Sequence, residues 1–323
     1  MRYVSPLAPV RRIANQYYTG ILQDSKDDWE EAAGTMANIY ENSYVTIAAT
    51  FARDSNGGLF VDRARAHPKR RLKSHPHLYV RTLPEPFPLG VHKKFNRDSW
   101  TLLTRAWVYQ ERRISPCTIH FGGHQVYWEC KHRFASEDAR EDRTLHINQI
   151  YPIDSRQSNA DPWIRWQLAV EEYSGLDLTY ETDRLPAIAA IVERTARDLR
   201  SDDVYIAGTW QNSILSDIFW HIPFGRRETY AKRTTPSWSW ASTHGTRIQF
   251  CSTGNYWKTT EVLSIDYTAV GAVHLGEVKD ASLVLRAPTL TITDLEGLSQ
   301  VQVKDITTDP HSYIPAAFTR RYT

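Results

Sequence analysis

Residues 105–130 read RAWVYQERRISPCTIHFGGHQVYWEC, and this stretch, named the central block below, decides the fold that we expect. Its first part predicts a helix over residues 100–114, because five residues recur at helical spacing and give the helix an inward stripe. These residues are Leu103, Trp107, Gln110, Glu111 and Ile114. Its second part alternates in hydrophobicity around Gly122-Gly123, a dipeptide that closes two-residue turns, and predicts a β-hairpin over residues 117–130.

The Gly-Gly turn also predicts the register of the hairpin. The opposed pairs are Cys117 and Trp128, Ile119 and Val126, and Phe121 and His124. One face of the hairpin is then largely apolar and carries Cys117, Ile119, Phe121, Val126, Trp128 and Cys130. The other face carries Thr118, His120, Gln125, Tyr127 and Glu129. We expect the apolar face to lie against the core and the polar face to lie outside it.

Sulfur and imidazole side chains in and just after the central block raise the question of a metal site. They are Cys117, His120, His124, Cys130 and His132. The predicted hairpin places the two cysteines on the face opposite to His120, whereas a tetrahedral site needs its ligands on one side. We therefore interpret the cysteines as structural and the histidines as surface residues, with a metal site as the alternative, and expect no bound metal.

The central block resembles the third block of the fungal heterokaryon incompatibility (HET) domain. Residues 23–60, QDSKDDWEEAAGTMANIYENSYVTIAATFARDSNGGLF, are similar to the same family in the same order. Further downstream, WQLAVEEYSGLDLTYETDRLPAIAAI, YIAGTW and PSWSWAS are similar as well. The resemblance runs from Gln23 to about Ser242. The residues that we assign to these motifs, or to the structure around them, are Gln23, Asp24, Trp29, Tyr40, Arg105, Trp107, Gln110, Gly122, Trp128 and Glu129.

The resemblance implies a mixed α/β fold that is distantly similar to TIR domains. HET domains usually open with a block like LSYxWG and a WIDxLCI-type run, and neither is found here, so we expect an incomplete HET domain over residues 1–135. Within it we predict a helix over residues 25–41 and a strand over residues 44–51. A linker is expected over residues 136–160, and a helical and then β-rich extension over residues 161–323.

Composition limits the partners. The chain of 323 residues has 39 basic and 37 acidic residues, a balance that does not predict a nucleic-acid or membrane partner for the whole molecule. Three cysteines argue against a disulfide framework, and no apolar run approaches membrane-spanning length, so we expect a soluble, cytoplasmic protein. We interpret the basic stretch at residues 68–73 as a solvated loop, with nuclear import as the alternative.

The candidate chemistry centres on Glu111. Neither a glycine-rich nucleotide motif nor a GxSxG elbow occurs in the sequence. A carboxylate on an inward face has its pKa raised by desolvation and could act as an acid or a base, or it could pair with Arg105 or Arg112 as part of the structure. Some TIR domains cleave NAD with one glutamate, so the resemblance implies Glu111 as the corresponding carboxylate. NAD would then be a substrate, and we expect no cofactor.

Three functions follow from these observations. The first is a HET protein of fungal non-self recognition and programmed cell death, acting through a protein partner or self-association. The second is a TIR-like NAD-cleaving enzyme that depends on Glu111. The third is a truncated, inactive member of the family.

Overall fold

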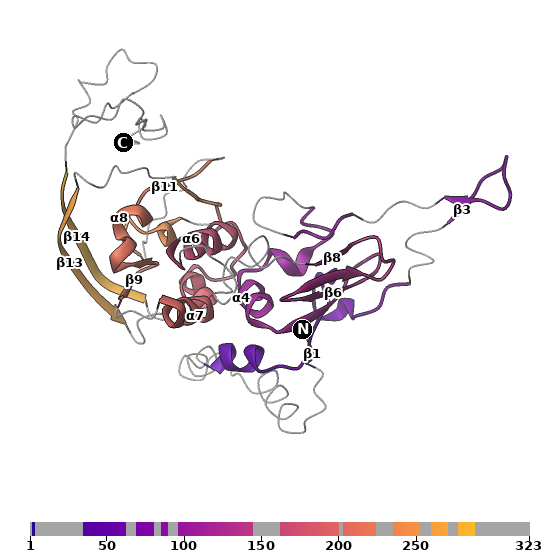
Figure 1. The fold of residues 1–323 in the computed structure, drawn as a ribbon, viewed down its shortest axis with the longest axis horizontal. Coiled ribbons are helices and arrows are strands. Elements are labelled where there is room, and N and C mark those ends of the chain that lie inside the picture. The colour runs from indigo at the N-terminus through magenta and orange to yellow at the C-terminus, as the bar shows by residue number, and fades with distance from the viewer. Residues whose placement is uncertain are drawn as a thin grey trace, which may run out of the picture.

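The structure is a computed structural model that describes residues 2–3, 35–62, 69–80, 85–89, 96–144, 162–199, 203–223, 235–243, 245–251, 260–270 and 277–287. It is a mixed α/β fold, as the sequence predicts. A six-stranded sheet in the order β1-β2-β5-β6-β7-β8 occupies one half of the molecule, and helices fill the other half (Figure 1). No helix of the described residues is both long and apolar enough to cross a membrane.

The sheet is antiparallel except at one pair of strands. Its strands are β1 (Arg2–Tyr3), β2 (Thr46–Ala48), β5 (Cys117–Phe121), β6 (Val126–Cys130), β7 (Arg133–Ser136) and β8 (Asp142–Thr144). Strands β2 and β5 pair in parallel, with Ile47 opposite Ile119. Parallel neighbours require a long connection, and here it contains helix α4 (Ala106–Ile114). The sheet and α4 are therefore built as one unit.

Helix α4 lies between the sheet and the helical half (Figure 1). Its Val108 joins a small aromatic core beneath the sheet, where Phe87 and Phe134 are almost fully buried. Its Ala106 and Tyr109 join a larger core formed mainly by the helical half. Because burial of a large apolar side chain contributes roughly 1.5–3 kcal/mol, both cores stabilise the position of this helix.

The helical half is packed around buried tryptophans. Its elements are α6 (Pro162–Tyr173), η3 (Glu181–Arg184), η4 (Pro186–Ile188), α7 (Ala189–Leu199), η5 (Gln211–Ser213), α8 (Ile214–Asp217) and η6 (Trp240–Ser242). Trp166, Trp210 and Trp240 are each at most 1% exposed. Trp166 contacts Trp210 with ring centroids 6.1 Å apart, so aromatic contacts connect α6 to the strands that follow α7.

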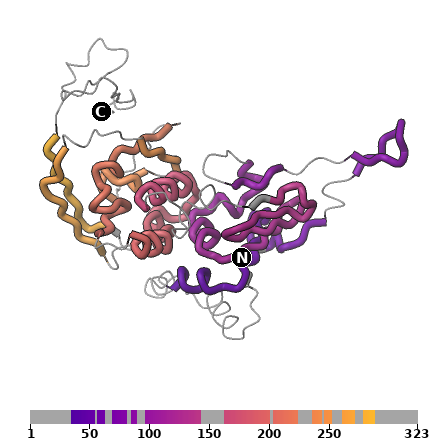
Figure 2. The backbone as a smooth tube through the Cα atoms, viewed as in Figure 1, coloured from indigo at the N-terminus to yellow at the C-terminus, as the bar shows by residue number. Residues whose placement is uncertain are grey.

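Antiparallel pairs of strands complete the described chain. They are β9 (Tyr205–Ile206) with β10 (Thr209–Trp210), β11 (Trp220–His221) with β12 (Gln249–Phe250), and β13 (Glu261–Val270) with β14 (Glu277–Arg286). The β13–β14 ribbon forms the outer edge of the helical half (Figure 2). The pair β3 (Arg70–Arg71) and β4 (Tyr79–Val80) instead projects from the sheet half as an arm (Figure 1).

Two predicted elements are shorter than expected. The helix predicted over residues 100–114 is divided into η2 (Thr101–Thr104) and α4, because Arg105 is extended, with φ −86° and ψ 131°. Arg105 forms a parallel bridge with Asp177 at this break. The strand predicted over residues 44–51 is confined to β2. Residues 35–41 are helical where a helix over residues 25–41 was predicted, and residues 25–34 lie outside the described part.

The predicted register of the hairpin is wrong by two residues. Phe121 pairs with Val126, Cys117 pairs with Cys130, and the Gly122 N–H donates to the Gln125 carbonyl, so the chain turns at residues 123–124 instead of at Gly122-Gly123. A shift of two residues keeps the same side chains on each face, since the side-chain period of a strand is two. The predicted sorting of residues into two faces therefore survives the change of register.

The predicted burial of the two faces is also wrong, because the polar face is the buried one. His120, Tyr127 and Glu129 are 0%, 1% and 2% exposed, whereas Trp128 on the apolar face is 38% exposed. The polar face lies against α4 and Phe87, where its polar groups find partners inside the protein. His120 is accordingly not a surface residue.

The described chain does not divide into two separate units at the boundary predicted after residue 135. Strand β8 lies within the residues predicted as a linker, and it extends the sheet to residue 144. The core of the helical half also contains Tyr40 and Tyr109 from the first 135 residues. The predicted helical and then β-rich order of residues 161–323 agrees with the described elements there.

Candidate functional site

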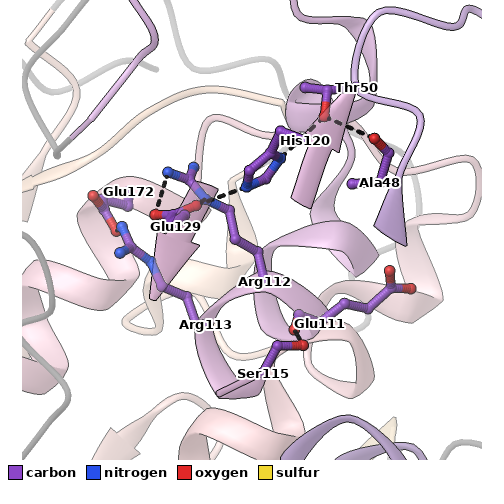
Figure 3. A network of polar contacts seen from close by, with 9 residues as sticks. All are labelled: Ala48, Thr50, Glu111, Arg112, Arg113, Ser115, His120, Glu129 and Glu172. Atoms are coloured by element: carbon purple, nitrogen blue, oxygen red, sulfur yellow. Dashed lines mark hydrogen bonds and ion pairs between the residues drawn. The ribbon is translucent and has the colours of Figure 1, made fainter. Parts of the chain in front are cut away.

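Two consecutive arginines in the last turn of α4 hold the buried charges of the central block. Arg112 and Arg113 are about 100° apart around the helix, since each residue advances by that angle. Their side chains therefore point to different partners, Glu129 on the sheet and Glu172 on α6 (Figure 3). Positive charge at a helix C-terminus is also favoured by the helix dipole.

Arg112 and Glu129 form a bidentate ion pair. Arg112 Nε donates to Glu129 Oε2 at 2.7 Å, and Arg112 Nη2 donates to Oε1 at 2.8 Å. The side chains are 11% and 2% exposed, so the pair is almost completely removed from water. A pair with this planar geometry offsets the cost of burying two charges far better than a single contact does.

His120 extends the pair into a chain of hydrogen bonds, which we name the Glu129 network (Thr50, Arg112, His120 and Glu129). His120 Nε2 lies 2.8 Å from Glu129 Oε2, and His120 Nδ1 lies 3.0 Å from Thr50 Oγ1. An ionised carboxylate only accepts hydrogen bonds, so Nε2 carries the proton. With a neutral imidazole, the single hydroxyl proton of Thr50 is shared between His120 Nδ1 at 3.0 Å and the Ala48 carbonyl at 3.3 Å. We assign this tautomer from the network itself.

The pKa values fix the charges of this network. Burial alone would raise the pKa of Glu129, but the Arg112 guanidinium and the His120 hydrogen bond hold it well below its usual value. Burial lowers the pKa of His120, and Glu129 only partly opposes this effect. At neutral pH the network therefore contains one anion, one cation and a neutral imidazole.

An aromatic ring covers the network on one side. The Phe87 ring centroid lies 4.8 Å from that of His120, and the guanidinium carbon of Arg112 lies 5.1 Å from the Phe87 ring. Phe87 is 1% exposed and excludes water from the charges beneath it. The low local dielectric strengthens the ion pair and makes the loss of either partner costly.

Arg113 forms the second buried pair. Arg113 Nη2 contacts Glu172 Oε2, and the Tyr109 hydroxyl donates to the same oxygen at 3.0 Å. Burial, followed by the adjacent Glu172 charge, raises the pKa of Tyr109 well above its usual value. The Arg113 and Glu172 side chains are 3% and 8% exposed. This pair connects α4 to the helical half in the way that the Glu129 network connects α4 to the sheet.

Glu111 lies apart from both pairs, and its carboxylate points away from the Glu129 network (Figure 3). Burial raises its pKa to about 7, against a hydrogen bond from the Tyr40 side chain that lowers it. Arg112, one of the two partners considered for it, binds Glu129 instead. Its main-chain oxygen accepts a hydrogen bond of 2.7 Å from Ser115 Oγ. Glu111 therefore titrates near neutral pH beside the buried Tyr40.

Three other predicted residues of this segment connect it to the helical half. Gln110 Oε1 accepts from the Ala190 main-chain N–H at 3.1 Å and so binds the start of α7. Trp107 Nε1 donates to Asp183 Oδ2 at 3.0 Å. Arg105 is exposed and acts through its extended backbone, next to the Ala106 N–H that donates to the Asp177 carbonyl at 2.9 Å.

The hairpin residues differ in their surroundings. Gly122 is buried, and a Cβ there would lie 3.0 Å from both the Gln125 carbonyl oxygen and the Tyr127 ring, so the close approach favours glycine. Trp128 lies on the outer face. Of the remaining predicted motif residues, Gln23, Asp24 and Trp29 lie outside the described residues. The structure thus brings Glu129 into a network and places Trp128 away from it.

The sequence did not identify Thr50, Phe87 and Glu172 as partners in this region, and it considered Arg112 as a partner of Glu111 and not of Glu129. Part of the signal was present, since His120 and Glu129 share a face in any register that preserves parity. The two consecutive arginines of the preceding helix were a further signal, but which of them binds Glu129 is decided by the tertiary fold. The partners themselves come from segments far apart in the chain, as Thr50 and His120 do.

The chemistry available to the network is limited by its burial. The order hydroxyl, imidazole, carboxylate also occurs in hydrolase triads, but Thr50 is fully buried, and within the described part of the chain its hydroxyl meets His120 and the Ala48 carbonyl. Among the described residues, no three His, Cys, Asp or Glu side chains gather as metal ligands. Two cavities of about 530 and 520 Å³ lie beside β13 and α7, and no residue of the network lines either.

Comparison with known proteins gives a family for the segment that ends in this helix. No curated protein and no solved structure matches the chain. The family model described as heterokaryon incompatibility protein (HET) matches residues 18–111, which include β2 and most of α4. The family that the sequence resembles is thus found independently, as a match of its model to residues 18–111.

Proposed function

We propose that this protein acts in fungal heterokaryon incompatibility, where recognition of a non-self protein or of a second copy of the chain leads to cell death. The HET-family match over residues 18–111 carries this proposal. The charged groups of the central block pair with one another inside the protein and are not presented to a substrate. This supports a function through protein contacts. On this proposal the block is a rigid support for surfaces that bind a partner.

The arm formed by residues 69–80 is the surface that we propose for this contact, and we name it the basic arm. All of its residues are exposed, and it has four lysines and arginines but no acidic residue. Four large apolar side chains, Leu72, Leu78, Tyr79 and Val80, are between 38% and 60% exposed on the same arm. A two-stranded hairpin gains little stability alone, and a partner would cover its exposed apolar groups. Together with the positive charge of the arm, these groups fit an acidic protein surface with apolar patches.

The test is expression in a filamentous fungus, with viability compared with an empty vector. We expect the full chain to be toxic and the variant Lys69→Ala/Arg70→Ala/Lys73→Ala to lose most of this toxicity at equal protein level. A control that removes exposed charge elsewhere, Lys279→Ala/Arg286→Ala, should remain toxic. Equal viability with the full chain and with the empty vector would count against the proposal and favour an inactive family member.

A second function, cleavage of NAD, is favoured by one observation. Burial raises the pKa of Glu111 to about 7, and carboxylates with such a shift are common among catalytic acids and bases. On this proposal NAD is the substrate, Glu111 is the essential carboxylate, and no cofactor is required. The location would be cytoplasmic in either case.

Nicotinamide release from NAD tests the second function. Purified chain would be compared with Glu111→Gln, which keeps the shape of the side chain, and with Glu41→Gln, the same change at a residue paired with Arg197 elsewhere. Release that is lost in Glu111→Gln and kept in Glu41→Gln would support cleavage by Glu111. Absence of release from the folded full chain would remove this function.

A further inference from the structure

Two cysteines face each other at the open end of the β5–β6 hairpin. Cys117 and Cys130 are directly opposed in the register, and both are free and half-buried. Their thiols are close enough to share a hydrogen bond. The third cysteine, Cys251, lies near His221 in another part of the fold, with its sulfur 3.5 Å from His221 Nδ1. The first two cysteines therefore form a pair that the third does not join.

The hydrogen-bond pattern of the hairpin fixes the spacing of this pair. The Gly122 N–H donates to the Gln125 carbonyl at 3.1 Å, so residues 122 and 125 form a hydrogen-bonded pair. Hydrogen-bonded and non-hydrogen-bonded pairs alternate along an antiparallel ladder, which makes the pair of Cys117 and Cys130 non-hydrogen-bonded. The Cα atoms of such a pair are about 4.5 Å apart, within the roughly 4.4–6.8 Å that a disulfide spans.

We propose that Cys117 and Cys130 are a modification site that forms a reversible cross-strand disulfide by exchange with a small disulfide such as glutathione disulfide. The thiolate of one cysteine attacks the small disulfide, forms a mixed disulfide and releases the first glutathione thiolate. The second cysteine, as its thiolate, then attacks the protein sulfur of the mixed disulfide and releases the second. The two protons lost by the cysteines end on these leaving groups, so two glutathiones are formed and the protein loses two hydrogens.

The position of the bond gives it a consequence for the Glu129 network. Cys130 directly follows Glu129, and Cys117 begins the strand that carries His120. A bond between the two strands at this point restricts the unfolded chain and fixes the spacing of the strands that present the imidazole and the carboxylate. The oxidised protein should therefore unfold at a higher temperature than the reduced protein.

Accessibility and acidity set the rate of the exchange. Burial, with a smaller contribution from Cys130, raises the pKa of the Cys117 thiol, so less of it is thiolate at neutral pH. The exchange should accordingly become faster as the pH rises from 7 to 9. The same burial restricts attack to small disulfides that can reach half-buried sulfur atoms.

The experiment uses the full chain, reduced and then incubated with glutathione disulfide and glutathione in defined ratios at pH 8. After free thiols are blocked with iodoacetamide, intact mass and peptide mapping report the state of each cysteine. We expect blocked thiols to fall from the three in the sequence to one, on Cys251, with a bond between Cys117 and Cys130. The control Cys251→Ala should still form the bond, and Cys130→Ser should stop at a glutathione adduct on Cys117.

Two results would overturn the proposal. One is a full chain in which glutathione adducts accumulate on Cys117 or Cys130 without closing to the bond. The other is a native chain whose three thiols all stay reduced at ratios of glutathione disulfide to glutathione that oxidise the same chain in urea. Thermal unfolding of the oxidised and reduced forms supplies a second readout, and equal midpoints would contradict the predicted stabilisation.

Discussion

Arg112 of α4 and Glu129 of β6 meet side-on through two hydrogen bonds of 2.7 and 2.8 Å, and neither side chain is more than 11% exposed. The next residue, Arg113, binds Glu172 of α6. Two adjacent residues thus attach one short helix to the sheet and to the helical half. This arrangement explains why α4 has buried residues in both cores.

Replacing Arg112 with methionine should destabilise the protein strongly. Arg112→Met keeps much of the side-chain length but leaves the Glu129 carboxylate buried without its cation, a loss of about 3–5 kcal/mol in the free energy of unfolding. Urea denaturation at pH 7 measures it. In the control Arg133→Met, which breaks the exposed pair with Asp142, the loss should be about 1 kcal/mol or less. Equal losses in the two variants would contradict the role given to the buried pair.

Glu111→Gln should change how stability depends on pH. The pKa of Glu111 is raised to about 7 in the folded chain, from 4.5, so the folded state holds this proton more tightly than the unfolded state. The contribution of Glu111 to stability is therefore greatest below about pH 4.5 and falls by roughly 3 kcal/mol as the pH rises to about 7. The glutamine variant lacks this loss. The free energy of unfolding of the variant minus that of the full chain should therefore be larger at pH 8 than at pH 4. A constant difference between the two proteins over this range would contradict the assignment.

Acidification should act on the Glu129 network with the opposite sign. The pKa of Glu129 is lowered in the folded state, so its contribution is present above about pH 4.5 and is lost as the pH falls through the lower folded value. Burial also lowers the pKa of His120, so stability from the neutral imidazole begins to fall below about pH 6.5. In Thr50→Val/His120→Phe/Glu129→Met, urea denaturation should show a weaker loss of stability between pH 7 and pH 4. An unchanged pH profile in this variant would place the acid sensitivity elsewhere.

The sequence predicted the elements of the central block better than it predicted their surroundings. Helical spacing placed α4, and alternation placed the hairpin, because both periods are local properties of the chain. The register failed because Gly122-Gly123 was interpreted as a two-residue turn, whereas Gly122 is favoured by its close approach to the Tyr127 ring. Packing, and not a two-residue turn, thus explains the glycine at residue 122.

The burial of the polar face could not be read from local pattern. A face with Thr118, His120 and Glu129 is predicted to lie in solvent unless its partners are known. Those partners are Arg112 and the ring of Phe87, and they reach the hairpin only through the tertiary fold. The polar face is therefore buried, against the hydrophobic pattern, because its charged groups have partners in the tertiary fold.

Gln110→Leu should weaken the attachment of α7 to α4. The change removes the acceptor of the Ala190 N–H and leaves that buried donor without its partner, which costs about 1–3 kcal/mol. Hydrogen exchange at the Ala190 amide should become faster, and urea denaturation should show the loss. The control Gln211→Leu changes an exposed glutamine and should leave both measurements near those of the full chain. Unchanged exchange at Ala190 in Gln110→Leu would contradict this attachment.

The basic arm gives a prediction that separates a contact surface from an import signal. Short runs of lysine and arginine also direct proteins to the nucleus, and residues 69–73 form such a run in the exposed arm. We expect a fluorescent fusion of the full chain to be cytoplasmic, and Lys69→Ala/Arg70→Ala/Lys73→Ala to have the same location with reduced toxicity. A full chain in the nucleus that moves to the cytoplasm in the variant would instead assign the arm to import. Because the apolar side chains of the arm remain in the variant, the comparison isolates the effect of its charge.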